Sequence, residues 1–171
     1  METSSIYHKC AEILGQHAQD VMVRMSSVAH PGESLKLETK SLKRRYAEGV
    51  KVSFRGLSPD NKPIAGFFIC AFHLYNAARD LARDIAVKMG LGPELSDTRE
   101  GVENVLGEFL NIIIGLTCSD WTKEGLDINF DPPEKLGGHR IEPVSQEALA
   151  YHLTLKMTGA REISIFLNFL F

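Results

Sequence analysis

One long helical pattern limits how this chain can fold more than any other feature. Residues 97–118 read DTREGVENVLGEFLNIIIGLTC, and apolar side chains recur at helical spacing around most of the circumference. We expect the core side of this helix to be filled by Val102, Val105, Leu106, Phe109, Leu110, Ile112, Ile113 and Leu116. Asp97 and Glu100 have the spacing of a capping box, which predicts that the helix begins there. The width of the apolar surface indicates a largely buried helix.

Five polar or small residues interrupt this apolar surface along one narrow arc. At about 100° per residue, a single strip of the helix contains Asn104, Gly107, Glu108, Asn111 and Gly115. We call these five residues the polar strip. A glycine inside a helix costs about 1 kcal/mol relative to alanine, so two glycines in one strip indicate that something approaches closely. We therefore predict that a partner docks on Asn104, Gly107 and Gly115.

Glu108 and Asn111 are the chemically distinctive pair of the polar strip. A spacing of three places a negative charge and a carboxamide on one helix face, where both can reach a single external target. A carboxamide both donates and accepts hydrogen bonds, which suits it to positioning a water molecule. Phosphoryl transfer depends on such positioning more than on a strong base. Taken alone, however, this spacing favours a solvated face or a bond to a neighbouring loop.

The remaining chain changes between helical and strand periodicity. A first helix is predicted from apolar residues that recur between Ile6 and Met25. A second helix is predicted at residues 77–89. Strands are predicted at residues 49–57, 64–72 and 126–130, and a closing hairpin of two strands at 148–171. This order predicts an α+β fold in which an antiparallel sheet packs against long helices. Phe166 and Leu170 make the second face of the last strand apolar, so we expect a helix or a partner subunit to cover it.

Composition narrows the class of protein. At 171 residues, 44% of them hydrophobic, the chain suffices for one compact domain, which we expect to span residues 1–171. A net charge of -3 with mixed signs creates no broad field for nucleic acid or an anionic membrane, and we interpret the basic residues within 40–45 as a solvated loop. The start of the chain lacks the pattern of a signal peptide, and no run approaches the roughly 18 apolar residues of a membrane span. We therefore expect a cytoplasmic protein.

Several common site types find no support in the sequence. The six histidines form no cluster with the spacing of a zinc site, so we predict no metal site. Three separated cysteines without a CxxC pair indicate reduced core residues; these are Cys10, Cys70 and Cys118. Nucleophile-elbow, Walker and dinucleotide-binding patterns do not occur, so the sequence does not support hydrolases, NTPases or dehydrogenases that depend on them.

The sequence around Glu108 and Asn111 resembles that of a known family. The run GEFLNIIIG, which contains both residues and Gly115, closely resembles the signature helix of the CheC/CheX/FliY family of chemotaxis phosphatases. Further segments look like the strands and helices of that family; they are residues 49–57, 65–72, 76–90, 126–133 and 148–171. The resemblance covers most of the chain from about residue 48 onward. It also implies the CheC/CheX-like form of the α+β fold.

The resemblance implies a function and a mechanism. Family members remove phosphate from the phosphorylated aspartate of a response regulator such as CheY. Carried over to this chain, the family pattern assigns Asn111 to positioning the attacking water and Glu108 to contacting the active-site lysine of the regulator. No cofactor of the protein's own is implied, because Mg²⁺ would be held by the partner receiver domain.

The number of motifs points to one branch of the family. CheC-like members resemble a duplicated unit with two sites, whereas CheX-like members keep one site and resemble homodimers. This chain has a single Glu-x-x-Asn, since the first helix offers only Glu12 followed by Gly15 at the matching spacing. CheX is therefore the closer match, and a homodimer is implied. Residues 26–46 match no family pattern, and residues 134–146 match only loosely.

Two other interpretations of the polar strip stay open at this stage. The first is a non-catalytic binding or adaptor module that docks a receiver domain through the same helix face. The second is a purely structural dimer in which the strip is internal. Burial of Glu108 would favour the structural dimer.

Overall fold

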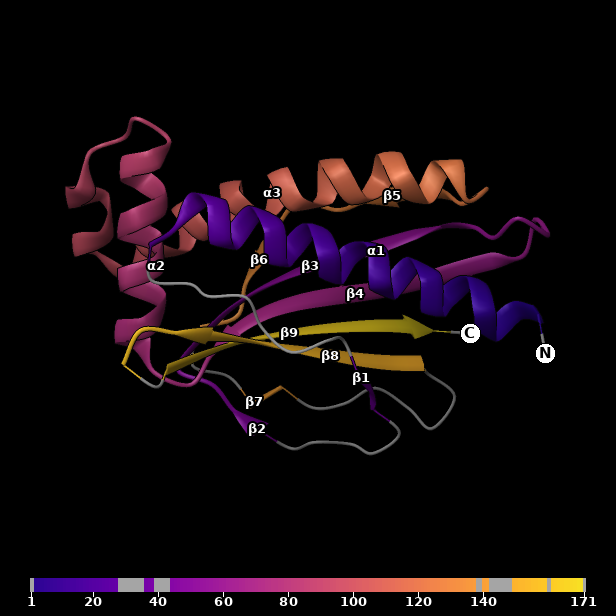
Figure 1. Ribbon diagram of the computed structural model, residues 1–171, viewed down its shortest axis with the longest axis horizontal. Coiled ribbons are helices and arrows are strands. Elements are labelled where there is room, and N and C mark those ends of the chain that lie inside the picture. Colours follow the sequence, from indigo (N-terminus) through magenta and orange to yellow (C-terminus); the bar gives the residue numbers. More distant parts are fainter. Residues whose placement is uncertain are drawn as a thin grey trace.

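The computed structural model describes residues 2–27, 36–38, 44–137, 140–141, 149–159 and 161–170. Long helices lie over one face of a large antiparallel sheet (Figure 1). The helices are α1 (Glu2–Met25), α2 (Tyr75–Lys88) and α3 (Arg99–Lys123), with a short 3-10 helix, η1 (Pro93–Asp97), before α3. The strands are β1 (Lys36–Glu38), β2 (Arg44–Arg45), β3 (Glu48–Leu57), β4 (Pro63–Phe72), β5 (Asp127–Phe130), β6 (Glu134–Lys135), β7 (Arg140–Ile141), β8 (Leu149–Met157) and β9 (Arg161–Leu170). The predicted α+β fold is confirmed.

The main sheet is antiparallel throughout. Its strands follow the order β1-β8-β9-β4-β3-β5, and β6 adds a short second pairing to β3. A separate small sheet pairs β2 with β7. This pairing corrects part of the solvated-loop interpretation, because Arg44 and Arg45 form β2, whereas residues 40–43 lie outside the described residues.

The β3–β4 hairpin shows why the strand predictions succeeded. Val50, Val52 and Phe54 alternate along β3 and are buried under the helices. The chain then turns through Ser58, whose carbonyl oxygen accepts a hydrogen bond from the backbone N–H of Asn61 at 2.9 Å. Asn61 has a φ of 56°, a left-handed conformation that asparagine tolerates better than most residues. The alternation and the turn chemistry therefore fix the same register.

The sheet face under the helices carries the main core. α1, α2 and α3 bury their apolar sides against β3, β4, β8 and β9. The largest fully buried side chains are Trp121, Tyr151, Phe68, Phe72, Phe109, Phe169, Met22, Leu81, Ile85, Leu106, Leu110 and Ile113. Trp121 also donates its indole N–H to the carbonyl of Cys10 at 2.9 Å, so this core ties α3 directly to α1.

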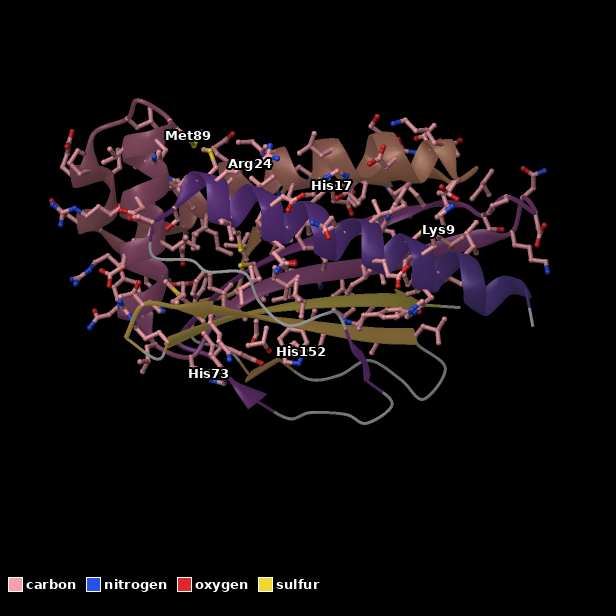
Figure 2. All side chains as sticks on the ribbon, in the orientation of Figure 1. Lys9, His17, Arg24, His73, Met89 and His152 are labelled. Atoms are coloured by element: carbon pink, nitrogen blue, oxygen red, sulfur yellow. The ribbon has the colours of Figure 1, made fainter. Side chains whose placement is uncertain are left out.

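The opposite sheet face carries a second, smaller apolar cluster. Phe67 and Ile69 of β4 are buried there, and Phe166 packs beside them. Tyr46 contributes to this cluster, and the ring of His152 stacks on Phe166 with centroids 4.4 Å apart, on the face away from the helices (Figure 2). We expected a helix or a partner subunit to cover this face. In the described residues, Tyr46 and Leu136 of the same chain provide part of the cover, and cover by a partner subunit stays a prediction.

The beginning of α3 differs from the sequence prediction. The N-cap is Thr98, whose hydroxyl accepts a hydrogen bond from the backbone N–H of Gly101 at 3.0 Å. Asp97 belongs to η1, so the predicted capping box with Glu100 does not form. The helix begins one residue later because the 3-10 turn occupies the preceding residues.

α3 is also long and apolar enough, by length and composition alone, to cross a membrane. Half of its most apolar 18-residue window is buried inside the protein, and core helices pass the same test, so this is weak evidence for a span.

The predicted cysteine environments are confirmed for two of the three. Burial raises the pKa values of Cys10 and Cys70 to about 12, whereas Cys118 is half-buried, and none of the three forms a disulfide.

Candidate functional site

The polar strip lies on the outer surface of α3. α3 runs beside α1 on the helical side of the sheet (Figure 1). Asn104, Glu108, Asn111 and Gly115 are exposed. Burial of Glu108 would have favoured the structural dimer with an internal strip, and its exposure in this chain gives that interpretation no support. The strip is therefore available to an external partner.

Glu108 and Asn111 have no competing polar contacts with the part of the chain that the structure describes. Their side chains make no hydrogen bond or ion pair with any residue that the structure describes. The carboxylate and the carboxamide are one helical turn apart on the same surface. Both groups can therefore engage an external target without first breaking a bond to a described residue, and the described loops give no support to the loop-bonding alternative.

The two glycines of the polar strip have different surroundings. A Cβ placed on Gly115 would meet no atom within 4 Å, so this part of the strip is open. Gly107 is buried, and a Cβ placed there would lie 3.6 Å from Cβ of Pro133, between β5 and β6. The missing side chain of Gly107 thus has an intramolecular neighbour, while docking at Gly115 remains a prediction.

Ile112 and Leu116 were placed on the core side, and this prediction is wrong. Their residues are 39% and 44% exposed, respectively, and they lie between the polar strip and the buried surface of α3. The prediction failed because the apolar pattern alone does not show which part of the α3 surface the other elements cover. The two side chains add an exposed apolar margin to the strip, which their positions next to Asn111 and Gly115 in the sequence could have indicated.

α3 is held to α1 near its C-terminal end. Figure 2 shows His17 on the side of α1 toward α3, and its Nε2 lies 2.8 Å from Oδ2 of Asp120. Lys123 donates to the other carboxylate oxygen of Asp120 at 2.7 Å. The hydrogen bond from Lys123 and then that from His17 lower the pKa of Asp120 below its ordinary value.

The N-terminal end of α3 is held to β3 by a buried carboxylate. Glu48 is 0% exposed, and its Oε2 accepts a hydrogen bond from Nε of Arg99 at 2.7 Å. Arg99 also donates through Nη2 to the carbonyl of Ala47 at 2.6 Å, and its guanidinium lies 5.5 Å from the ring centroid of Tyr75. The hydrogen bond to Glu48 raises the pKa of Arg99 above its ordinary value. Sequence reasoning missed this pair, because nothing local connects residues 51 positions apart.

The polar strip forms a helix surface that suits a macromolecule better than a small ligand. A hollow of about 770 Å³ lies at the end of the sheet where β3 turns into β4. It is lined by residues of β3, β4, β5 and β9 and by none of the polar strip. Small-molecule sites are usually concave, whereas protein partners bind exposed surfaces. Among the described residues, no group of three or more His, Cys, Asp or Glu side chains could hold a metal ion.

Comparison with known proteins identifies the family. Residues 68–162 match the family model described as chemotaxis phosphatase CheX, and this match includes the whole of α3. It covers more than half of the 171 residues, so the chain belongs to the chemotaxis phosphatase CheX family. The resemblance seen in the signature helix is thereby confirmed. A search of curated protein sequences gave no significant match.

Solved structures with the same fold include several chemotaxis proteins. A CheX from Desulfovibrio desulfuricans is 15% identical with a TM-score of 0.69, covering 95% of this chain and 98% of its own. A CheC-like protein from Shewanella oneidensis is 16% identical with a TM-score of 0.69, covering 92% and 95%. The complex of CheX with CheY, BeF3 and Mg²⁺ from Borrelia burgdorferi is 19% identical with a TM-score of 0.70, covering 92% and 96%. At these identities the similarity establishes a common fold.

Proposed function

We propose that this protein hydrolyses the aspartyl phosphate of a CheY-like receiver domain through the polar strip of α3. The observation that carries the proposal is that Glu108 and Asn111 are exposed on α3 of a chemotaxis phosphatase family member and make no hydrogen bond or ion pair with any described residue. The structural neighbour from Borrelia burgdorferi, solved as a complex of CheX with CheY, BeF3 and Mg²⁺, supports a receiver domain as the partner.

Asn111 supplies the water-positioning group in this proposal. Its carboxamide accepts a hydrogen bond from the attacking water through Oδ1 and donates another through Nδ2 to the phosphoryl group or its surroundings. Phosphoryl transfer needs the attacking oxygen in line with the leaving oxygen, so fixing this water lowers the barrier without a strong base. The water attacks phosphorus directly, the bond to the aspartyl oxygen breaks, and no covalent intermediate forms on this protein.

Glu108 supplies the docking charge next to that water. Its carboxylate pairs with the active-site lysine of the receiver domain and thereby aligns α3 with the phosphoryl group. Mg²⁺ belongs to the receiver domain, where it neutralises charge on the phosphoryl oxygens, so this protein requires no cofactor of its own. The two residues thus divide orientation and water placement between them.

The margin of the polar strip provides apolar contact area. Ile112 and Leu116 are both more than one third exposed, and Gly115 leaves open space beside them. Apolar area removed from water contributes about 25 cal/mol per Å², so these side chains can supply affinity that the charged pair in water cannot. Asn104, exposed one turn before Glu108, extends the docking surface toward the N-terminus of α3.

A homodimer and a cytoplasmic location complete the proposal. The polar strip lies on the helical side of the molecule, so self-association through the sheet would leave it accessible. Receiver domains act in the cytoplasm, where the proposed partner would be met. Light scattering during size-exclusion chromatography tests the homodimer, and a monomer at micromolar concentration would contradict it.

The test is the decay of aspartyl phosphate on receiver domains of the same organism. Each receiver is phosphorylated with acetyl phosphate and followed with and without this protein and its Asn111→Ala variant. We expect acceleration with the wild type and a loss of at least 100-fold with the variant, in line with the removal of a water-positioning group. Ser119→Ala, at an exposed position further along α3, is the matched control and should leave the rate unchanged.

The same assay separates catalysis from simple docking. Hydrolysis that is insensitive to Asn111→Ala would contradict the role of Asn111. If a beryllofluoride-loaded receiver binds but no receiver loses phosphate faster, the protein is the non-catalytic binding module considered above. Loss of acceleration with retained binding in Asn111→Ala is the result expected for the phosphatase.

A further inference from the structure

α3 has polar anchors at both ends, and the polar strip lies between them. At the C-terminal end, Asp120 and Glu124 bind His17 and Lys9 of α1 at 2.8 and 2.6 Å. At the N-terminal end, Arg99 and Glu103 form the ion pairs between α3 and other described elements. Arg99 pairs with Glu48, and Glu103 pairs with Lys135. Apart from the apolar side chains that pack in the main core, the half that carries Glu108 and Asn111 is therefore held to other elements by a small number of ion pairs.

Arg99 occupies a position that the helix itself does not favour. It is the first residue of α3, where the positive end of the helix dipole disfavours a cation. Its contacts provide the explanation, because the planar guanidinium binds Glu48 through Nε and the carbonyl of Ala47 through Nη2. Two donors of one rigid group thereby fix the first turn of α3 against the start of β3.

Glu48 completes this anchor from inside the protein. Its side chain is fully buried, one oxygen accepts from Arg99 at 2.7 Å, and the other accepts from the backbone N–H of Gly49 at 3.0 Å. A buried carboxylate is tolerated only when it is paired and hydrogen-bonded in this way. The Glu48 carboxylate is held on the β3 side by Gly49 and has little freedom to follow α3 if the helix turns.

We propose that Arg99 and Glu48 are positioning residues for the polar strip, which hold the N-terminal half of α3 at one rotation about its axis. The predicted effect on turnover rests on the proposed phosphatase function, whereas the anchoring itself does not. Asn111 lies roughly 18 Å along the helix from Arg99 at 1.5 Å per residue. A misplacement of about 1 Å can lower an enzymatic rate by about 100-fold, because the attacking water must be in line.

A double variant separates positioning from stability. Arg99→Met alone leaves the Glu48 charge buried without its partner and is expected to unfold readily. The double variant Arg99→Met with Glu48→Gln removes both charges together and keeps a group that accepts from the N–H of Gly49. Because no unpaired charge is then buried beside the half-exposed Arg99 position, the double variant should lose much less stability than Arg99→Met. Folding is therefore restored, but the guanidinium bridge is not.

The experiment measures three properties of the purified full chain. For the double variant we expect a melting temperature close to that of the wild type, faster amide hydrogen exchange over residues 102–111, and a 10- to 100-fold lower kcat on the acetyl-phosphate-labelled receiver. The dissociation constant for the beryllofluoride-loaded receiver should change by less than about threefold, because the exposed apolar margin tolerates small shifts that in-line attack does not.

Lys123→Met is the matched control for this experiment. It removes an exposed charge pair with Asp120 at the other end of α3 and should change none of the three measurements. A double variant with wild-type kcat would overturn the positioning role, and so would a kcat that rises and falls only with the folded fraction. Unchanged exchange over residues 102–111 would overturn the anchoring.

Failure of the proposed function leaves a different signature. If the wild type accelerates phosphate loss from no receiver, the proposed function fails, yet hydrogen exchange still decides whether Arg99 and Glu48 hold α3. Faster exchange in the double variant and unchanged exchange in Lys123→Met would then support the anchoring. Equal exchange in all three proteins would reject it.

Discussion

Replacing Gly115 by alanine should make the protein more stable and less active at the same time. Gly115 is a helical residue on the exposed surface of α3, and a Cβ there meets no atom within 4 Å. Alanine is favoured over glycine inside a helix by about 0.5–1 kcal/mol, so the free energy of unfolding should rise by that amount. For a chain of this length, about 1 kcal/mol corresponds to a rise of roughly 2–4 °C in Tm.

The added methyl group occupies the space in which the partner is proposed to dock. Inserting a methyl group into a closely packed contact costs about 1–3 kcal/mol. Because about 1.4 kcal/mol corresponds to a tenfold change in an equilibrium constant, kcat/KM on the phosphorylated receiver should fall by roughly 5- to 150-fold. Gly115→Ala should thus raise the stability of the helix and lower kcat/KM through the interface, so the two contributions can be measured separately.

Thermal unfolding by circular dichroism and aspartyl-phosphate decay at limiting receiver concentration measure the two effects. Gly107 was included in the predicted docking surface, but it is buried, and its Cβ would make an ordinary 3.6 Å contact with Pro133 inside the same chain, so Gly107→Ala is the matched control. We expect this control to raise Tm similarly and to leave kcat/KM nearly unchanged. A Gly115→Ala variant with higher Tm and unaltered kcat/KM would refute close docking at Gly115, and an unaltered Tm would refute the reasoning about the helix.

Three further outcomes follow from the same structure. Leu116→Ala should weaken binding of a beryllofluoride-loaded receiver about fivefold by calorimetry, since Leu116 is 44% exposed and burial of a whole leucine is worth about 1.5–3 kcal/mol; unchanged affinity would remove it from the interface. Gly101→Ala should lower the free energy of urea unfolding by about 3 kcal/mol, because its Cβ would lie 1.6 Å from the carbonyl oxygen of Leu95; an unchanged midpoint would contradict that close approach. At pH 8 a thiol reagent should modify half-buried Cys118 before Cys10, whose burial raises its pKa to about 12; equal labelling by peptide mass mapping would contradict this order.

The sequence predicted most of the elements because local patterns determine them. Residues 49–57 and 64–72 combine strand periodicity with a turn that contains Asn61, and the structure pairs them as β3 and β4 in that register. The polar strip could also be predicted from the sequence, since helical spacing alone places Asn104, Glu108, Asn111 and Gly115 on one face. Their exposure agrees with that geometry.

Features that depend on contacts between distant segments were not predictable in this way. Ile112 and Leu116 look like core residues from their helical spacing, and only the packing of the other elements against α3 shows that they are exposed. Glu48 and Arg99 are 51 positions apart, and neither position carries a local signal that names the other. The prediction of a capping box at Asp97 was wrong because the next residue, Thr98, is the N-cap of α3. An error of one residue is usual when helix ends are assigned.

The absence of internal contacts at Glu108 and Asn111, within the described part of the chain, has an evolutionary consequence. Side chains that support nothing else can be exchanged at little thermodynamic cost, so selection can remove or restore chemistry at these positions while the scaffold survives. Descendants of such a protein can lose their enzymatic activity through one or two substitutions and persist as folded binding proteins. In relatives of this chain, identity at these two positions should therefore distinguish enzymes from adaptors better than overall sequence similarity.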